Sequence, residues 1–255
     1  QSLPLKKGGK KIAVMGPNAN DSVMQWGNYN GTPAYTKTIL QGIKDVVGAD
    51  DEVVYIPGCS WVERTLIHSV YDQCQSADGQ GFSATYWNNK DREGEPVATM
   101  QLTTPFNLCT SGATVFAPGV NLTDFSGSYK SVFTPKASGE VLFNFYVCGL
   151  AELYIDGERV RRIFNQHGGR SNTYAMQAEA GKSYDIEIKF QYFAGDAQIN
   201  FDLGFKEEVN MTKTVAQVKD ADIVIFAGGI TPRLEGEEMG VNLPGFKGGD
   251  RTDIE

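Results

Sequence analysis

The chain has 255 residues, of which 41% are hydrophobic and 11% aromatic, which is enough apolar material for packed cores and too much for an intrinsically disordered protein. The net charge of −8 and the isoelectric point near 4.9 argue against nucleic acid as a partner, because phosphate binding requires clustered Lys and Arg. No apolar run approaches the roughly 20 residues that a membrane span needs, and the length favours two domains.

An α/β pattern opens the chain. The apolar run Ile12–Met15 precedes Gly16-Pro17 and predicts a buried strand. Apolar residues at helical spacing over 39–47 predict a helix that Gly48 ends. Residues 53–56 predict the next strand, so the order is strand–helix–strand and the two strands should be parallel.

A change of period follows. Apolar positions from Leu66 to Cys74 still have helical spacing and predict a second helix. From Gly81 to about Lys206, short alternating strands and turn residues predict an all-β sandwich. Within this block, Asp156-Gly157 indicates a tight hairpin turn.

The α/β pattern then returns. A helix is predicted around residues 214–218 and a third strand over 223–226. The sequence therefore predicts a discontinuous α/β domain, residues 1–80 and 207–255. This partial parallel-sheet α/β sandwich is interrupted by an inserted all-β sandwich, residues 81–206.

Neither a metal nor a cofactor is predicted. The four cysteines lack metal-type spacing and only two histidines accompany them. Cys59 and Cys74 are either bridged or buried free thiols. Gly16-Pro17-Asn18 lacks both the glycine pattern of dinucleotide sites and a phosphate-binding lysine.

A cluster of carboxylates follows the third α/β strand. Glu235, Glu237 and Glu238 lie in one loop, and loops at the carboxyl ends of core strands hold ligand sites in open α/β sheets. Carboxylates this close repel one another, so one can stay protonated near neutral pH, as a general acid in sugar hydrolysis requires. The alternative is a solvated acidic loop. Asp250-Arg251 is interpreted as a structural ion pair or cap.

This loop resembles the acid/base loop of glycoside hydrolase family 3 in its order of strand, Gly228-Gly229, Glu-Gly-Glu and Gly249-Asp-Arg-x-Asp. Residues 10–20 and 27–33 are similar to the opening of that family's second domain, an α/β sandwich. The resemblance implies a retaining, exo-acting β-glucosidase or β-xylosidase for short plant-type oligosaccharides or aryl β-glycosides. In that family the nucleophile is an Asp on a preceding TIM barrel. This sequence contains no such barrel, so the chain is expected to be inactive alone.

The resemblance also implies roles for residues. The family pattern places the acid/base at the Glu after a Gly, which is Glu237; Glu235 is the second choice and Glu238 the third. An aromatic face can stack on a sugar and amides can bind its hydroxyls, although ordinary loop packing explains such residues equally well. The substrate-binding candidates after the first strand are Trp26, Tyr29 and Asn30.

The β block resembles the protective-antigen-14 domain, a β-sandwich associated with carbohydrate recognition, over residues 81–89, 124–129, 151–157 and 180–184. Some family 3 enzymes carry this module inserted in the second domain. Calcium-dependent relatives of the module use two adjacent Asp residues. The block has no such pair, so calcium-dependent sugar binding is not predicted.

Two groups of residues in the β block are candidates for contact with sugar. Tyr86 and Trp87 form either a sugar platform or part of the core. Residues 164–170 form either a loop that overhangs the active site and limits substrate length or a plain hairpin connection. The substrate contacts in this segment are Phe164, His167 and Arg170.

The rival hypothesis is a non-catalytic carbohydrate-binding protein in which the β-sandwich binds sugar. For the enzyme, the resemblance favours a periplasmic or extracellular location. The chain starts at Gln1 without Met or an apolar signal region, so any export signal lies upstream or has been removed. The identity of the sugar and formation of a homodimer both stay open.

Overall fold

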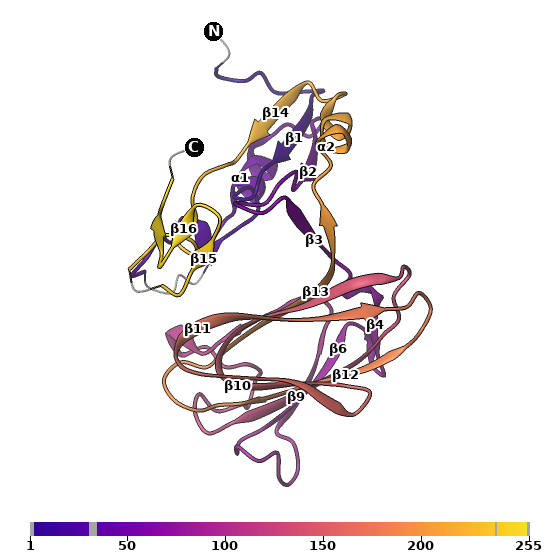
Figure 1. Ribbon diagram of the computed structural model, residues 1–255, viewed down its shortest axis with the longest axis vertical. Coiled ribbons are helices and arrows are strands. Elements are labelled where there is room, and N and C mark those ends of the chain that lie inside the picture. Colours follow the sequence, from indigo (N-terminus) through magenta and orange to yellow (C-terminus); the bar gives the residue numbers. More distant parts are fainter. Residues whose placement is uncertain (1–2, 31–34, 238, 254–255) are drawn as a thin grey trace. The chain divides into compact units, whose positions relative to one another are not determined.

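The computed structural model describes residues 3–30, 35–237 and 239–253; the side chains of residues 23, 167 and 168 lie outside the description. The chain divides into two compact units (Figure 1). One consists of Gln1–Leu66 and Glu207–Glu255, and the other of Ile67–Lys206. The fold is therefore an α/β unit interrupted by a second unit, as the sequence predicts, with the first crossing after Leu66 rather than after residue 80.

A three-stranded parallel sheet forms the centre of the first unit. Its order is β14-β1-β2, with β1 at Lys11–Met15, β2 at Glu52–Ile56 and β14 at Ile223–Phe226. Ile12 lies beside both Ile223 and Val53. Because β1 is central, its apolar run is covered on both sides, and Ala13 and Val14 are fully buried. The predicted parallel pairing is confirmed.

Two capped helices accompany this sheet. Helix α1 is Ile39–Val46, and the Thr38 hydroxyl accepts from the Gln41 amide at 3.2 Å. Helix α2 is Met211–Val218, and the Asn210 side chain accepts from the Lys213 amide at 2.9 Å. Both confirm predicted helices. The unit also contains the short 3-10 helix η1 at Val23–Gln25 and a small antiparallel sheet of β15 at Asn242–Leu243, β16 at Phe246–Lys247 and β17 at Asp250–Arg251.

The predicted helix from Leu66 to Cys74 is wrong. Strand β3 covers Thr65–Ser69 and pairs with β13, a 3-10 turn η2 covers Tyr71–Gln73, and β4 starts at Cys74. The Val70 amide donates to the Leu203 carbonyl at 2.9 Å, which ties the segment to the β core. Tyr71 and Cys74 are buried there. A turn between two strands therefore produces the same apolar spacing as a helix.

The second unit is an antiparallel β-sandwich (Figure 1). Its core is rich in aromatic rings: the Phe82 ring, for example, meets Phe106 and Phe201 edge-on, with centroids 5.3 and 5.5 Å apart. Besides β3, its strands are β4 Cys74–Ser76, β5 Gly79–Gln80, β6 Phe82–Trp87, β7 Ala98–Leu102, β8 Phe106–Cys109, β9 Ser126–Phe133, β10 Gly139–Ile155, β11 Glu158–Ala178, β12 Tyr184–Gln191 and β13 Gln198–Glu208, with the turn η3 at Ser111–Ala113.

The long β10–β11 hairpin joins both layers of this sandwich. Its turn is the predicted Asp156-Gly157, with φ of 51° and 81°. The register of β10 shifts between Val147 and Gly149; residues before the shift pair with β13, and residues after it pair with β12.

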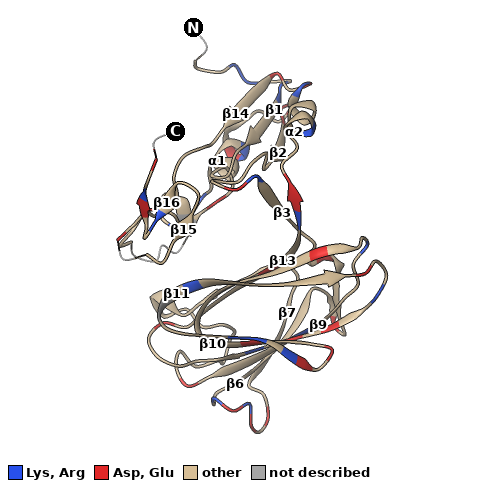
Figure 2. Ribbon diagram, viewed as in Figure 1, with Lys and Arg blue, Asp and Glu red and all other residues tan. Residues whose placement is uncertain are grey.

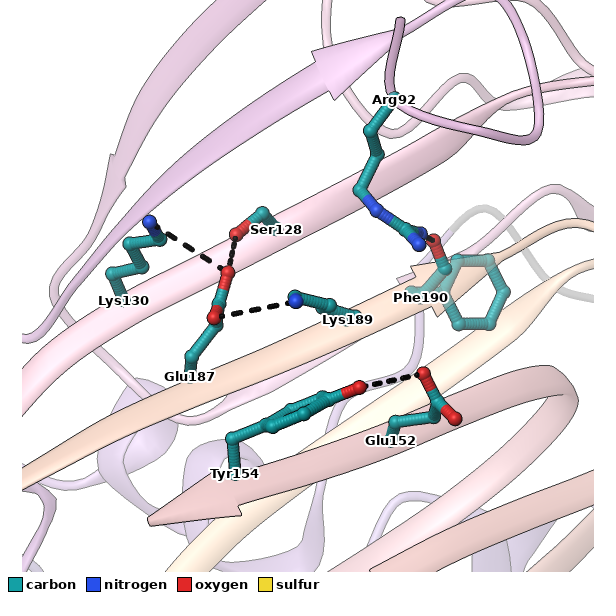
Figure 3. Close-up of polar contacts among 8 residues, drawn as sticks. All are labelled: Arg92, Ser128, Lys130, Glu152, Tyr154, Glu187, Lys189 and Phe190. Carbon is teal, nitrogen blue, oxygen red and sulfur yellow. Dashed lines mark hydrogen bonds and ion pairs between the residues drawn. The ribbon is translucent and has the colours of Figure 1, made fainter. Parts of the chain in front are cut away.

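The outer face of β9, β10 and β12 carries a network of charges. Glu187 accepts from the Ser128 hydroxyl at 2.9 Å and lies 3.6 Å from the ammonium groups of both Lys130 and Lys189 (Figure 3). Charged residues are short interruptions in largely uncharged strands (Figure 2). The alternation that buries one face thus places mutually neutralising charges on the other.

All four cysteines, Cys59, Cys74, Cys109 and Cys148, are free thiols, so the bridge between the first two does not form. Over the described residues, no helix is long and apolar enough to cross a membrane.

Candidate active site

The candidate site lies where the chain leaves β1 and β14. The Asn18 amide donates to the Ala227 carbonyl at 3.1 Å, which joins the two exits. A Cβ on Gly16 would lie 2.4 Å from the Ala227 oxygen, and the φ of Gly16 is 103°. Only glycine at position 16 therefore lets the segments after β1 and β14 approach each other this closely. Parallel pairing of β1 and β14 brings the two following loops to the same edge of the sheet.

The acidic loop after β14 has a fixed backbone. The amides of Leu234 and Glu235 both donate to the Thr231 carbonyl, at 2.9 and 3.3 Å. Thr231 and Leu234 are buried. The Arg233 guanidinium donates to Asp21 at 2.8 Å, across to the loop after β1. The side chains of Thr231 and Leu234 face inward, while Glu235 and Glu237 are exposed.

A second contact holds the loop from the other side. The Gly236 amide donates to the Gly249 carbonyl at 3.0 Å, and Gly249 lies between β16 and β17. A Cβ on Gly249 would lie 2.1 Å from the Gly236 oxygen. Gly249 in the Gly248-Gly-Asp-Arg segment thus has a structural role, because glycine at this position lets the hairpin reach the acidic loop.

Two neighbouring residues of the loop after β1 contact the acidic loop. The Tyr29 hydroxyl donates to Glu237 Oε2 at 2.6 Å, and this hydrogen bond raises the pKa of Tyr29. The Asn28 amide donates to the backbone carbonyl of Glu235 at 2.9 Å. Asn28 and Glu237 border an open cleft of about 490 Å³ that is also lined by Met24, Gly27, Ile230, Thr231, Pro232, Glu235, Gly236, Gly249 and Asp250.

The other predicted contacts near β1 have local roles. The Trp26 indole donates to the Thr36 hydroxyl at 2.7 Å, and the Asn30 amide donates to the Gly27 carbonyl at 3.0 Å. These bonds shape the loop that presents Tyr29. Glu238 lies outside the described residues.

Of the two roles suggested for Tyr86 and Trp87, sugar platform or core, the structure places Tyr86 in the core. Tyr86 is 0% exposed and its ring packs on Tyr129 at 5.8 Å, because β6 turns Phe82, Ala84 and Tyr86 toward the core. Trp87 faces the other way but is half-buried, and its indole donates to the Gly94 carbonyl at 3.1 Å.

Residues 164–170, suggested as an overhanging loop or a plain hairpin connection, lie within a strand and form no separate loop. Phe164 and Arg170 lie within the continuous strand β11, where the paired residues of β10 change register. Phe164 meets Phe193 edge-on at 4.7 Å. The side chain of His167 lies outside the description. The two glycines therefore mark an irregularity in a strand, not the hinge of a loop.

Sequence reasoning missed several contacts that build the edge. Asp21 and Asn28 bind the acidic loop, and Trp61 donates from its indole to the Asn18 side chain at 2.6 Å. Trp61 and Arg251 border a second cleft of about 590 Å³. Among the described residues, no three His, Cys, Asp or Glu side chains converge as metal ligands.

The comparison with protein families decides the family. The model of the glycosyl hydrolase family 3 C-terminal domain matches residues 1–255. The chain belongs to this family. The family 3 domain described here therefore has the α/β architecture with the inserted β-sandwich that the sequence predicts.

Relatives of this family 3 domain are glycoside hydrolases. It is 43% identical to a xylan 1,4-β-xylosidase of Xylanibacter ruminicola over 99% of the chain and 29% of that protein. It is 27% identical to the probable β-glucosidase H of Aspergillus clavatus, over 92% of the chain and 30% of that protein. The chain thus spans about 30% of the length of these relatives.

A solved structure has the same fold. The β-glucosidase of Kluyveromyces marxianus, in complex with glucose, superposes with a TM-score of 0.55 and 18% identity. The match covers 99% of the family 3 domain and 32% of that chain.

Proposed function

We propose that the domain supplies Glu237 as the acid/base of a retaining, exo-acting β-glycosidase. A nucleophilic Asp on another domain attacks the anomeric carbon, the glycosidic bond breaks, and Glu237 gives its proton to the departing oxygen. Water then attacks the anomeric carbon, the glycosyl–enzyme bond breaks, and Glu237 takes the proton of the water. Each cycle returns both carboxyl groups to their starting states.

The contact between Tyr29 and Glu237 is the observation that carries this proposal. It selects Glu237 from the acidic loop, because a neighbouring hydroxyl binds its carboxylate at 2.6 Å beside an open cleft. At Glu235, by contrast, the Asn28 side chain binds the backbone carbonyl and not the carboxylate. A held carboxylate at a cleft has the orientation that proton transfer to one oxygen atom requires.

The substrate that we propose is a β-linked xyloside first and a β-linked glucoside second. The order rests on 43% identity to the xylosidase against 27% to the glucosidase. Short plant-type oligosaccharides are the proposed natural substrates, and the periplasm or the outside of the cell is the proposed location. The burial of Tyr86, one of the two residues suggested as a sugar-stacking surface, counts against the rival hypothesis of a sugar-binding protein.

The test uses the full-length polypeptide that contains this domain. Nitrophenyl β-xyloside and β-glucoside measure substrate preference, and xylobiose provides a poor leaving group. Glu237→Gln should lower kcat/KM for xylobiose by about 10²- to 10⁴-fold. It should largely keep kcat/KM for the activated aryl xyloside, because the departing nitrophenolate needs no acid. Glu235→Gln is the matched control and should change both rates by only a few-fold.

Equal losses of kcat/KM on xylobiose and the aryl xyloside in Glu237→Gln would contradict the assignment. So would a loss confined to xylobiose in Glu235→Gln. The domain on its own should show no turnover of the aryl glycoside, because its nucleophile lies elsewhere. Turnover by the pure domain would refute a two-domain active site.

A further inference from the structure

We infer that Tyr29 is a positioning residue for Glu237: its hydroxyl holds Oε2, and Oε1 is the oxygen that exchanges the proton with the substrate. The inference rests on the proposed function, since it assigns a task within the same site. It also changes the role of Tyr29, which the sequence suggested as a surface for stacking sugar.

Packing does not explain the place of this side chain. Tyr29 is 87% exposed, so it buries little apolar surface. Its φ is 55°, a left-handed conformation that residues other than glycine rarely adopt. Such a conformation persists only where the surrounding structure holds it, and residues of this kind cluster at functional sites.

The surrounding loop is built to present the hydroxyl. Gly27 has a φ of 71°, and the Asn30 amide closes the turn by donating to the Gly27 carbonyl at 3.0 Å. The Trp26 indole anchors the start of the turn on the Thr36 hydroxyl at 2.7 Å. Tyr29 therefore projects from a turn that is pinned before it and closed across it.

Neighbouring contacts couple the loop backbone to the carboxylate. Asn28 holds the Glu235 carbonyl at 2.9 Å, and Tyr29 holds the Glu237 carboxylate at 2.6 Å. A Cβ on the intervening Gly236 would lie 2.7 Å from the Asn28 amide nitrogen. Gly236 thus permits the close approach that lets one turn fix both the chain and the side chain.

The chemistry of a phenol suits both halves of the reaction. When Glu237 is a neutral acid with its proton on Oε1, Oε2 is a carbonyl oxygen and accepts from the phenol. When Glu237 is ionised, Oε2 still accepts and the bond is stronger. The hydrogen bond to Glu237 raises the pKa of Tyr29, so the phenol stays a donor at neutral pH and does not replace Glu237 as the acid. The orientation of the carboxyl group is therefore kept through the cycle.

The test compares Tyr29→Phe with Tyr35→Phe in the full-length enzyme. Tyr35 is a matched control because it is 66% exposed and lies after the same strand. Both variants should fold normally by circular dichroism. Tyr29→Phe removes a hydrogen bond to a charged group of the active site. It should therefore lower kcat/KM for xylobiose about 10- to 100-fold, with far less effect on the activated aryl xyloside.

The dependence of the loss on the leaving group gives a readout that a structural role would not move. The loss of kcat/KM in Tyr29→Phe should grow as the leaving group becomes poorer, because only a poor leaving group needs the proton of Glu237. Tyr35→Phe should match the wild type on every substrate. A Tyr29→Phe enzyme with equal losses of kcat/KM on xylobiose and the aryl xyloside, or with a raised KM alone, would overturn the inference in favour of substrate stacking.

The same assay separates this failure from failure of the proposed function. Glu237→Ala is measured alongside, with sodium azide as the external nucleophile. Rescue of Glu237→Ala together with an unchanged Tyr29→Phe enzyme overturns only the positioning role. Without rescue of Glu237→Ala, both the proposed function and the positioning role are overturned.

Discussion

Gly249 and Gly248 provide a matched pair that tests how the acidic loop is held. Both have a positive φ, 92° and 68°, so alanine strains the backbone at each position. They differ in what a Cβ would meet. At Gly249 it would lie 2.1 Å from the Gly236 oxygen, and at Gly248 nothing lies within 4 Å.

The magnitude follows from the 2.1 Å approach. Ordinary contact begins near 3.4 Å, so in Gly249→Ala the acidic loop has to retreat by about 1 Å. This retreat weakens the 3.0 Å hydrogen bond from the Gly236 amide to the Gly249 carbonyl. Gly236 directly precedes Glu237, so the carboxylate moves with it. Misplacement of a catalytic group by 1 Å can cost about 100-fold in rate, so kcat/KM should fall about 100-fold.

The assay is kcat/KM of the full-length enzyme on xylobiose, with thermal melts to compare stability. Gly248→Ala should lose about 1–2 kcal/mol of stability to backbone strain and less than about threefold in kcat/KM. If Gly249→Ala retains kcat/KM within about threefold of Gly248→Ala, the loop is not held through this contact and the reasoning is wrong.

Four further predictions concern stability. The Tyr129 hydroxyl is buried with no hydrogen-bond partner among the described residues, so Tyr129→Phe should leave the free energy of unfolding in urea unchanged or raise it by about 1 kcal/mol. Tyr71→Phe should lower it by about 1 kcal/mol, because that hydroxyl donates to the Leu102 carbonyl at 2.9 Å; the opposite order would contradict both. Burial raises the pKa of Cys74 to about 12, so stability that is present below the unfolded thiol pKa of about 8.5 should be lost as the pH rises toward 12. Equal pH slopes for wild type and Cys74→Ala would argue against this. Backbone amides lower the pKa of Asp51, so its contribution is present above the unfolded pKa of about 3.9 and is lost as the pH falls below it; acid titration of Asp51→Asn should show a shallower loss.

The sequence predicts those parts of the fold that local patterns determine. Helix α1, the parallel strands and the Asp156-Gly157 turn each follow from a few adjacent residues, and all are observed. The helix predicted around Tyr71 failed because an apolar spacing alone does not distinguish a helix from two strands joined by a turn. Alternation likewise does not reveal which face is buried, so the sequence left Tyr86 between a sugar platform and the core, and the structure places it in the core.

The site was predictable only in part. The acidic loop could be located because it follows a core strand and carries clustered carboxylates. The contact of Tyr29 with Glu237 joins residues 208 positions apart, and the pairing of β1 with β14 brings them together. No local pattern contains that information. The Gly168-Gly169 pair suggested a hinge, but it lies within β11, where pairing with β10 continues on both sides.

The most direct test of the central claim is rescue of Glu237→Ala by azide in the full-length enzyme, with Glu235→Ala as the control. With an aryl xyloside as substrate, the covalent intermediate should form but its hydrolysis should be very slow. Azide should restore turnover because it attacks without needing a general base. The expected product is the β-xylosyl azide, in Glu237→Ala only. Absence of rescue there, with rescue in Glu235→Ala, would move the acid/base away from Glu237 and contradict the account.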